Sequence, residues 1–522
     1  MRYGAMAVES SKSINLGVSG VSFSDVIAVA RHGAKVVITP EAIVAMNASR
    51  KYIEEYASGG VPVYGVSTGF GALANRHIDV KDRTQLQKSL IRSHAAGVGP
   101  AVENEVVRAL MFLRLRTMTS GRTGVRVVVA QTYADFLNAN ITPVVPEFGS
   151  LGCSGDLAPL SHCALAMMGE GNVHDNSGKL VASLTAMKSA GITPVELEAK
   201  EGLALINGTD GMLGMLIMAC ADLEALCTVA DITASMSIEG LLGTDRVFAP
   251  DLHAPLRPQI GQAVSAANIF AMLKGSGIVA SHLENDSRVQ DAYSLRCAPQ
   301  VAGAVRDTVA YASTIAQREL ESSIDNPVVM PDGRVESNGN FHGAPVGYVL
   351  DFLAIAAADL GSMSERRTDR MLDQNRSSGL PPFLAQDPGV DSGLMIAQYT
   401  QAGLVSENKR LATPASVDSI PSSAMQEDHV SMGWSAARKL RKVVENLSRI
   451  LAIELVTSAR AIEFRKELKP SPATASVVKV LRTVVPGVGP DRFLSPELEA
   501  AVTLVQSGNV VTAAREVIKD LR

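Results

Sequence analysis

A glycine-rich stretch, residues 149–160 (GSLGCSGDLAPL), contains the residue types with the most unusual chemistry in this chain. Ser154 lies between Cys153 and Gly155, and glycine lets one backbone segment approach another closely. Spacing alone favours a tight entrance to a helix, with Asp156 as its N-cap. A phosphate-binding loop is excluded because no Lys-Ser/Thr ending follows. A hydrolase nucleophile elbow is excluded because Gly-x-Ser-x-Gly is absent.

A covalent interpretation of the same stretch is also open. A strained loop can bring the amide nitrogen of Gly155 onto the carbonyl carbon of Cys153 and close a five-membered ring, because glycine has the least shielded nitrogen. Ring closure and loss of the Ser154 hydroxyl would release two water molecules and leave an exocyclic methylidene. Such strain is kept where function needs it. The product would be an electrophile that no ordinary side chain provides.

The stretch resembles the signature of the aromatic amino-acid ammonia-lyases, which carry a 4-methylidene-imidazol-5-one (MIO) group made autocatalytically from Ala-Ser-Gly. Residues 151–162 fit this signature, and the likeness extends from about Ser22 to beyond Glu454. Cys153 stands in place of alanine, in a form similar to that of actinobacterial members. The resemblance implies that Cys153-Ser154-Gly155 forms the MIO, with no metal and no external cofactor. Because cysteine contributes its backbone carbonyl to the ring, the substitution is chemically tolerable.

The resemblance assigns roles to three further loop residues. Tyr64, in the glycine-flanked loop 61–71, is by type alone a core residue, but the matching family tyrosine is the general base. Asn207 is by type a turn or cap residue, and the resemblance gives it contact with substrate and prosthetic ring. Phe341, within Asn-Gly-Asn-Phe-His-Gly, matches a wall residue that packs against the substrate.

A second dense patch is Gln290-Asp291-Ala292-Tyr293-Ser294-Leu295-Arg296. Tyr293 and Arg296 are three apart and are neighbours if the segment is helical. Arginine binds carboxylates in a bidentate manner, although an isolated arginine is more often a salt-bridge residue. The resemblance makes Arg296 the clamp for the substrate carboxylate, with Gln290 beside it and Tyr293 as a second catalytic tyrosine. The division of acid and base roles between Tyr64 and Tyr293 stays open.

Two residues bear on the substrate side chain. By type alone, His94 is a core histidine and Glu427 a surface carboxylate. A buried carboxylate needs a donor, which an imidazole supplies and a phenyl ring does not. Family members that deaminate histidine place Glu after the Gln at 426, whereas those for phenylalanine and tyrosine do not. The sequence therefore predicts conversion of L-histidine to trans-urocanate and ammonia, with His94 and Glu427 holding the imidazole. Met425, often Asn in the family, is a departure of unpredicted effect.

Two rival interpretations stay open. The first is a tyrosine or phenylalanine ammonia-lyase, or a 2,3-aminomutase, with the same prosthetic group. Ala72 counts modestly against a tyrosine aminomutase, since these add an acidic residue after Phe70-Gly71. The second is an inactive helical homologue that serves as a scaffold.

Composition narrows the class of protein. The chain has 522 residues, a formal charge of -5 and only 4% aromatic residues, and it shows no basic stripe, so nucleic acid is not an expected partner. Five scattered cysteines provide no metal-ligand spacing. The first residues lack a secretory h-region, and the most apolar runs, 211–221 and 348–358, fall short of the roughly 20 residues that cross a bilayer. We therefore expect a cytoplasmic protein without membrane contact.

The elements that position these residues are mostly helices. Helical periodicity is expected near 106–118, 124–138 and 157–168, and long helices near 211–243, 298–322, 344–370, 394–412 and 430–463. The sequence predicts a mainly α fold. A mostly helical N-terminal domain (1–210) carries the prosthetic-group loop, and a long antiparallel helical bundle with small C-terminal helices (211–522) follows. The resemblance implies the ammonia-lyase/fumarase-like fold and a homotetramer whose active sites are shared between subunits.

Overall fold

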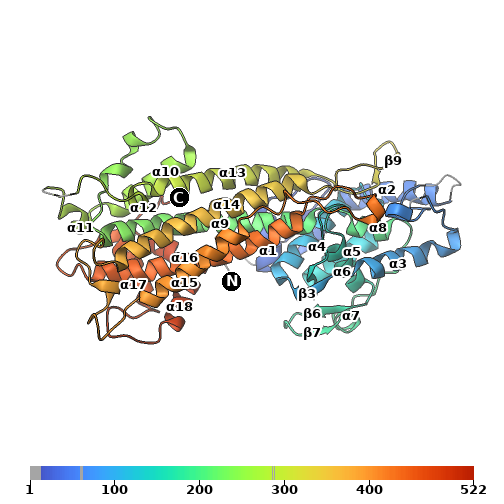
Figure 1. Cartoon of the computed structure of the whole chain (residues 1–522). Helices are drawn as coiled ribbons and strands as arrows, with labels where there is room; N and C mark the ends of the chain where they lie inside the picture. Colours follow the sequence, from blue (N-terminus) through green and yellow to red (C-terminus); the bar gives the residue numbers. More distant parts are fainter. Residues whose placement is uncertain (1–12, 59–62, 74, 285, 287) are drawn as a thin grey trace.

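The computed structural model describes residues 13–58, 63–73, 75–284, 286 and 288–522. The molecule is elongated: a bundle of long helices carries a mixed but mostly helical lobe at one end (Figure 1). The predicted mainly α fold is therefore confirmed. Residues 1–12, which bear on the expected absence of a secretory signal, and residues 61–62 of the expected Tyr64 loop lie outside the described part.

Five long helices build the bundle, close to where the sequence predicts them. They are α9 (Asp210–Gly240), α13 (Ala298–Glu321), α14 (Ala344–Leu372), α15 (Met395–Leu411) and α16 (Gly433–Glu463). Helices α9, α14 and α16 begin beside the glycine-rich loop and run away from the lobe, while α13 and α15 run back toward it (Figure 1). At the far end, the Arg465 guanidinium, just beyond α16, donates to the carbonyl of Gly240 at the end of α9. Helices α9, α14 and α16 therefore run parallel to one another, and the predicted antiparallel packing comes from α13 and α15, which run in the opposite direction.

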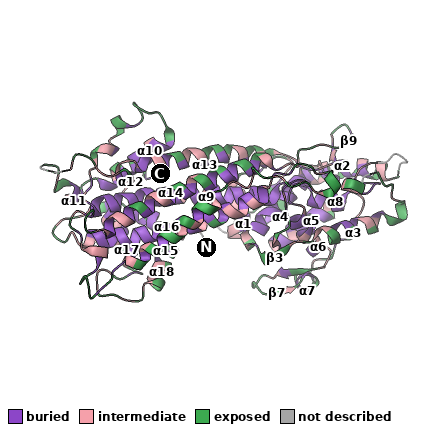
Figure 2. Cartoon of the chain, viewed as in Figure 1, coloured by how far each residue is buried: buried purple, intermediate pink, exposed green. Residues whose placement is uncertain are grey.

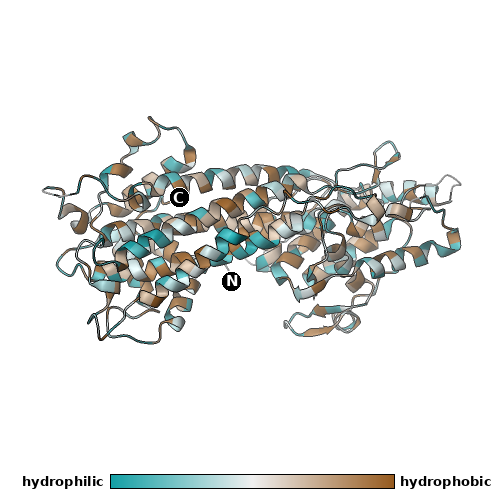
Figure 3. Ribbon diagram, viewed as in Figure 1, coloured by the Kyte–Doolittle hydropathy of each residue, from teal (hydrophilic) through white to brown (hydrophobic). Residues whose placement is uncertain are grey.

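Helix α9 lies at the centre of the bundle, and almost every residue in it is buried (Figure 2). A helix that is apolar on all sides is stable only inside other packed elements. It packs against α4, α13, α14 and α16. The surrounding helices are amphipathic, and hydrophobic and hydrophilic turns alternate along them (Figure 3). Helix α16, for instance, buries Leu440, Leu447 and Leu451 against the core.

Two helices are longer than the apolar runs, 211–221 and 348–358, that by themselves are too short to cross a membrane. By length and composition alone, α9 and α14 could cross a bilayer, with apolar windows that are 83% and 61% buried inside the fold. Packing within the helical bundle accounts for their apolar character.

The lobe combines helices with small sheets. The remaining helices of the described residues are α1 (Phe23–His32), α2 (Pro40–Ser58), α3 (Arg83–His94), α4 (Asn104–Thr119), α5 (Val127–Asn138), α6 (Leu157–Met167), α7 (Ser183–Ala190), α8 (Glu201–Ile206), α10 (Ile260–Leu273), α11 (Gly277–Ala280), α12 (Tyr293–Arg296), α17 (Pro472–Leu481), α18 (Ser495–Gln506) and α19 (Asn509–Arg515). The strands are β1 (Ile14–Leu16), β2 (Val36–Ile38), β3 (Val98–Ala101), β4 (Thr142–Pro143), β5 (Pro146–Phe148), β6 (Asn172–His174), β7 (Leu180–Ala182), β8 (Val328–Val329) and β9 (Val335–Glu336).

Strand pairing is local and short. Strands β1 and β2 are parallel, β3 pairs with β5, β8 pairs with β9, and β4-β6-β7 forms a three-stranded antiparallel sheet. No sheet in the described residues has more than three strands. The core therefore comes from helix packing, and one hydrophobic cluster extends from the lobe through the bundle.

Candidate active site

The glycine-rich loop between β5 and α6 adopts a backbone that only glycine accommodates easily. Gly152 and Gly155 have φ angles of +67° and +75°. A Cβ atom on Gly155 would lie 2.0 Å from the carbonyl oxygen of Gly208, so the two backbones touch. The amide of the next residue, Asp156, donates to that same oxygen at 2.7 Å. The loop thus rests directly on the segment that opens α9.

Asp156 does not cap its own helix, contrary to the sequence-based prediction. No side-chain hydrogen bond caps the start of α6. Instead, the carboxylate accepts the amides of Gly211 and Met212, both at 2.9 Å, and the Ser150 hydroxyl at 3.0 Å. Burial raises the pKa of the Asp156 carboxyl to about 7, while these hydrogen bonds oppose the shift. Asp156 therefore ties the loop to the N-terminus of α9, an association that local sequence does not reveal.

The N-terminal ends of two further long helices also meet the loop. The amide of Gly343, just before α14, donates to the carbonyl of Gly152 at 3.3 Å, and the amide of Met432, just before α16, donates to that of Leu151 at 2.9 Å. The Ser431 hydroxyl reaches the Gly152 carbonyl at 2.8 Å. Helix N-termini carry partial positive charge. The loop therefore lies where three helix dipoles favour developing negative charge.

We expect Gly155→Ala to destabilise the protein by about 3 kcal/mol or more, because the new methyl group would overlap backbone and the positive φ would be strained. The matched control is Gly178→Ala, where φ is +81° but nothing lies within 4 Å of the added carbon. Thermal unfolding of both variants separates the two causes. Equal losses of stability would show that the contact with Gly208 is relaxed.

Glu427 reaches the central tripeptide from a distant part of the chain. The Cys153 thiol donates to its Oε2 at 3.2 Å, the Ser154 hydroxyl lies 3.4 Å from Oε1, and the Ser422 hydroxyl donates to Oε2 at 3.1 Å. The backbone amide of Ser422 also donates to the Glu427 carbonyl at 2.9 Å, which closes a tight loop. The expected surface carboxylate is therefore half-buried against Ser154.

The turn before Glu427 is strained. Ser423, Ala424 and Met425 have φ angles of +52°, +53° and +70°, a region that non-glycine residues seldom occupy. Asparagine tolerates this conformation better than methionine does. The departure at Met425 therefore adds strain to the segment that presents Glu427.

Tyr64 and His94 lie within the electrostatic range of Glu427. The Tyr64 hydroxyl accepts the Gly71 amide at 3.2 Å. Burial and the Glu427 charge raise the pKa of Tyr64, which the Gly71 hydrogen bond opposes. His94 Nδ1 lies 2.9 Å from the Leu90 carbonyl. Burial lowers the pKa of His94, whereas the Leu90 carbonyl and the Glu427 charge act to raise it. Five predicted site residues thus come together within one chain: Tyr64, His94, Cys153, Ser154 and Glu427.

Asn207 lies beside the loop, one residue before Gly208. Its side-chain nitrogen donates to the Asn326 carbonyl at 3.3 Å, but its side-chain oxygen is buried without a hydrogen-bond partner among the described residues. A buried acceptor without a partner is costly and points to a missing ligand or group. The predicted Phe341 is half-buried two residues before Gly343, the residue that bonds Gly152.

Gln290, Tyr293 and Arg296 are at the opposite end of the molecule. Helix α12 is a single turn in which the Arg296 guanidinium stacks 4.6 Å over the Tyr293 ring, as the spacing predicts. Asp291 accepts the amide of Thr244, beyond the C-terminal end of α9. With 31 residues, α9 places about 45 Å between this patch and the glycine-rich loop. These residues do not reach Ser154 of their own chain.

Sequence reasoning missed two residues that shape the site. Ser422 orients Glu427, and nothing in its local sequence marks it. Arg114, fully buried in α4, donates to the carbonyls of Asn207 at 2.7 Å and Ile324 at 2.8 Å, and it pairs with Asp210 at 3.2 Å. Its position within the run Met111-Phe112-Leu113-Arg114-Leu115 was an available signal, because a charge inside an apolar helix requires partners.

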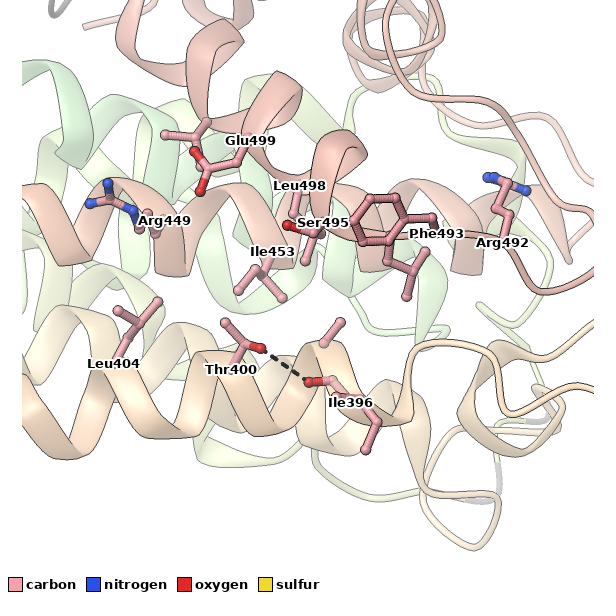
Figure 4. A pocket seen from close by; sticks show the side chains of 13 residues that line it. Ile396, Thr400, Leu404, Arg449, Ile453, Arg492, Phe493, Ser495, Leu498 and Glu499 are labelled. Carbon is pink, nitrogen blue, oxygen red and sulfur yellow. Dashed lines mark hydrogen bonds between the residues drawn. The ribbon is translucent and has the colours of Figure 1, made fainter.

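A separate pocket of about 400 Å³ lies between α15, α16 and α18, near the end of the bundle that holds α12 (Figure 4). Ile396, Leu404, Ile453 and Leu498 give it an apolar lining, and the Thr400 hydroxyl is bonded to the carbonyl of Ile396. Because it contains none of the predicted site residues, we do not assign the chemistry to it.

Comparison with known proteins identifies the family. Residues 21–483 match the aromatic amino acid lyase family. A histidine ammonia-lyase of Streptomyces avermitilis is 66% identical over 97% of this chain and 99% of that protein. One of Streptomyces coelicolor is 64% identical over 98% and 100%, respectively.

Solved structures agree with this match. A tyrosine aminomutase from Streptomyces globisporus superposes with a TM-score of 0.92 at 37% identity, covering 98% of this chain and 100% of that one. Histidine ammonia-lyase from Trypanosoma cruzi superposes with a TM-score of 0.89, also at 37% identity, covering 97% and 96%. The predicted class of carbon–nitrogen lyase is confirmed. The chain belongs to the aromatic amino acid lyase family.

Proposed function

We propose that this chain catalyses the non-oxidative deamination of L-histidine to trans-urocanate and ammonia, the first step of histidine degradation, in the cytoplasm. The observation that carries the proposal is the Glu427 carboxylate, which lies against Cys153 and Ser154 while its charge acts on Tyr64 and His94. Relatives at 64–66% identity bear the name histidine ammonia-lyase, whereas the aminomutase is more distant, at 37%.

We further propose that Cys153-Ser154-Gly155 forms the MIO group. The tight packing of Gly155 on Gly208, the unpartnered oxygen of Asn207 and the converging helix N-termini fit such a group. When formed, it supplies an electrophilic methylidene carbon that converts the substrate amine into a better leaving group. The surrounding residues then have to orient the substrate and remove one proton.

The proton to be removed is on the β-carbon of histidine, which is not acidic. Tyr64 is the base in this proposal, because its half-buried hydroxyl lies in the same site and the Gly71 amide stabilises its phenolate. Its Oη takes the β-proton while the bond between the α-carbon and nitrogen breaks. Nitrogen leaves as ammonia, and the carbon–carbon double bond of urocanate forms. Tyr293 is the second tyrosine of the proposal, without an assigned step.

Glu427 and His94 recognise the imidazole. The Glu427 carboxylate can accept the ring N–H of histidine, while His94 offers a second polar contact from the end of α3. A phenyl ring would leave the carboxylate without a donor, which is costly in a half-buried position. Sites built around hydrogen bonds strongly reject analogues that lack the bonding group. Phe341 packs against the substrate ring, and Asn207 contacts the substrate.

Arg296 is the proposed clamp for the substrate carboxylate, together with Gln290 and Tyr293. Because α9 separates this patch from Ser154 by about 45 Å within one chain, a second copy must supply it. The active site is therefore shared between subunits, and the family resemblance makes the proposed oligomer a homotetramer. No metal or external cofactor enters the proposal.

The proposal is tested by an ultraviolet assay of purified protein with L-histidine, in which urocanate should accumulate. Parallel reactions with L-tyrosine and L-phenylalanine, followed for coumarate, cinnamate and β-amino acids, should be far slower than the reaction with L-histidine. Formation of coumarate or β-tyrosine without urocanate would show that tyrosine, and not histidine, is the substrate.

We expect kcat/KM for histidine to keep rising with pH across the alkaline range without levelling off below about 10, because Tyr64 must lose its proton to act as the base and its pKa lies above the usual value for tyrosine. Removing the Glu427 charge should lower the pKa of Tyr64 and move the rising limb to lower pH. The measurement is a pH–rate profile of the wild-type protein and Glu427→Gln, with Tyr64→Phe as the inactive reference. If kcat/KM rises over the same pH range in Glu427→Gln as in the wild-type protein, Tyr64 is not the base whose titration limits the rate.

Shared sites predict complementation between two inactive variants. Ser154→Ala and Arg296→Ala chains should each be inactive, yet co-expression should restore about a quarter of the wild-type activity if subunits mix at random. An intact loop then meets an intact Arg296 from another subunit. A co-purified mixture, verified by two affinity tags, provides the measurement. Continued inactivity of such mixed oligomers would contradict the shared site.

A further inference from the structure

The Cys153 thiol has a contact that ring formation through its backbone does not require. Its Sγ donates to Oε2 of Glu427 at 3.2 Å, and the cysteine is only 8% exposed. The Ser422 hydroxyl donates to the same oxygen at 3.1 Å. Two donors from separate segments therefore hold one oxygen of a carboxylate that reaches the loop across 274 residues of sequence.

The other carboxylate oxygen is held differently. Oε1 contacts only the Ser154 hydroxyl among the hydrogen-bond partners of the described residues, at 3.4 Å. That hydroxyl is the group that Ser154 loses when the proposed ring forms. Oε1 then has no partner from this loop and is free to accept an N–H from a substrate, while Oε2 keeps both of its donors.

We infer that Cys153 is a positioning residue for substrate recognition: its S–H, with the Ser422 hydroxyl, fixes Oε2 of Glu427 so that Oε1 faces the imidazole of the substrate. The inference rests on the proposed function, because it assumes that Glu427 binds the imidazole. Alanine at this position would provide the same backbone carbonyl for the ring but no side-chain donor for the carboxylate. The cysteine therefore adds a contact to Glu427 beyond its part in the ring.

The thiol is suited to this role because it stays protonated. Burial and the Glu427 charge raise the pKa of the Cys153 thiol to about 12, so at neutral pH it is a donor and not a second anion. An S–H group is a weaker donor than a hydroxyl. Serine at this position should therefore hold the carboxylate at least as well as cysteine.

The first test is infrared spectroscopy of the thiol groups, which does not require turnover. The S–H stretching band of Cys153, identified by subtracting the spectrum of Cys153→Ala from that of the wild-type protein, should lie at lower frequency than the band of Cys163. Cys163 is a fully buried thiol in α6 and serves as the internal reference through Cys163→Ala. In Glu427→Gln, the Cys153 band should shift to higher frequency and the Cys163 band should not move. A Cys153 band that is insensitive to residue 427 would overturn the inference.

The second test is kinetic. Cys153→Ala should still lose two water molecules by peptide mass spectrometry, yet its KM for L-histidine should rise about five- to tenfold with a smaller change in kcat. Cys153→Ser should restore KM to within about twofold of the wild type, because the hydroxyl replaces the donor. In the Glu427→Gln background, Cys153→Ala should add no further increase.

Three results would overturn the inference: an unchanged KM in Cys153→Ala, a KM penalty that persists in the Glu427→Gln background, or failure of Cys153→Ala to lose the two waters, which would assign the thiol to ring closure. Failure of the proposed function would look different. The wild-type protein would then make no urocanate, while the infrared bands would still report whether Cys153 bonds Glu427.

Discussion

In Ser154→Ala, the peptide that spans residues 149–160 should not show the mass loss of two waters, and histidine turnover should fall by about a thousandfold or more. The reason is chemical: without the serine hydroxyl no methylidene can form, and the β-proton of histidine is too weakly acidic to be removed without activation of the leaving amine. Enzymes without their covalent electrophile lose most of their rate acceleration. Peptide mass spectrometry and the urocanate assay together provide the measurement.

The matched control for this prediction is Ser161→Ala. Ser161 is a buried serine in α6 whose hydroxyl donates to the Leu157 carbonyl at 2.7 Å, so its loss tests the general effect of removing a serine close to the loop. This variant should keep both the mass loss and the activity. An unmodified Cys153-Ser154-Gly155 peptide in active wild-type enzyme would refute the MIO proposal. The same peptide in inactive protein would favour the scaffold interpretation.

The helices could be predicted from the sequence because their signals are local. Apolar periodicity places α9, α13, α14, α15 and α16 within a few residues of their observed bounds, and these helices then have few ways to bury their apolar faces. The tripeptide could be recognised for the same reason, since its three residues are adjacent. The expected domain boundary near residue 210 falls at the start of α9 and stays a prediction.

The contacts between segments could not be predicted in this way. Asp156 directly precedes a helix and has the residue type of an N-cap, yet its carboxylate bonds amides of α9, 55 and 56 residues later. The choice depends on how the loop packs on Gly208, which local propensity does not encode. Similarly, residue type alone predicts that Glu427 is a solvated carboxylate, but the turn at residues 423–425 places it against Ser154.

The patch around Arg296 cannot take part in the site of its own chain. Its residues were predicted by resemblance, and the structure makes Tyr293 and Arg296 neighbours as their spacing predicts, but α9 separates them from the loop. The Arg296 Nε is buried without a hydrogen-bond partner among the described residues. An unsatisfied guanidinium nitrogen at one end of the bundle and an unsatisfied Asn207 oxygen at the other fit a site that is complete only when copies of the chain associate.

Glu427→Gln should lower kcat/KM for L-histidine by roughly a hundred- to a thousandfold, because the amide carries no charge and accepts the imidazole N–H less strongly. The loss should be specific to the imidazole: slow deamination of L-phenylalanine, which brings no ring donor, should fall less or rise. The variant should keep the MIO, since Glu427 contacts the side chains of Cys153 and Ser154 and not the ring-forming backbone. Steady-state kinetics with both amino acids and peptide mass spectrometry provide the measurements.

The matched control is Asp428→Asn, which removes the same charge from the exposed neighbouring residue. If the loss in Glu427→Gln came from the overall charge of the loop, Asp428→Asn should reproduce part of it. If it comes from the bond to the imidazole, Asp428→Asn should keep histidine turnover within about twofold, because an exposed charge is screened by water. Histidine turnover that survives intact in Glu427→Gln would show that the imidazole binds elsewhere, and the assignment of histidine as substrate would lose its structural support.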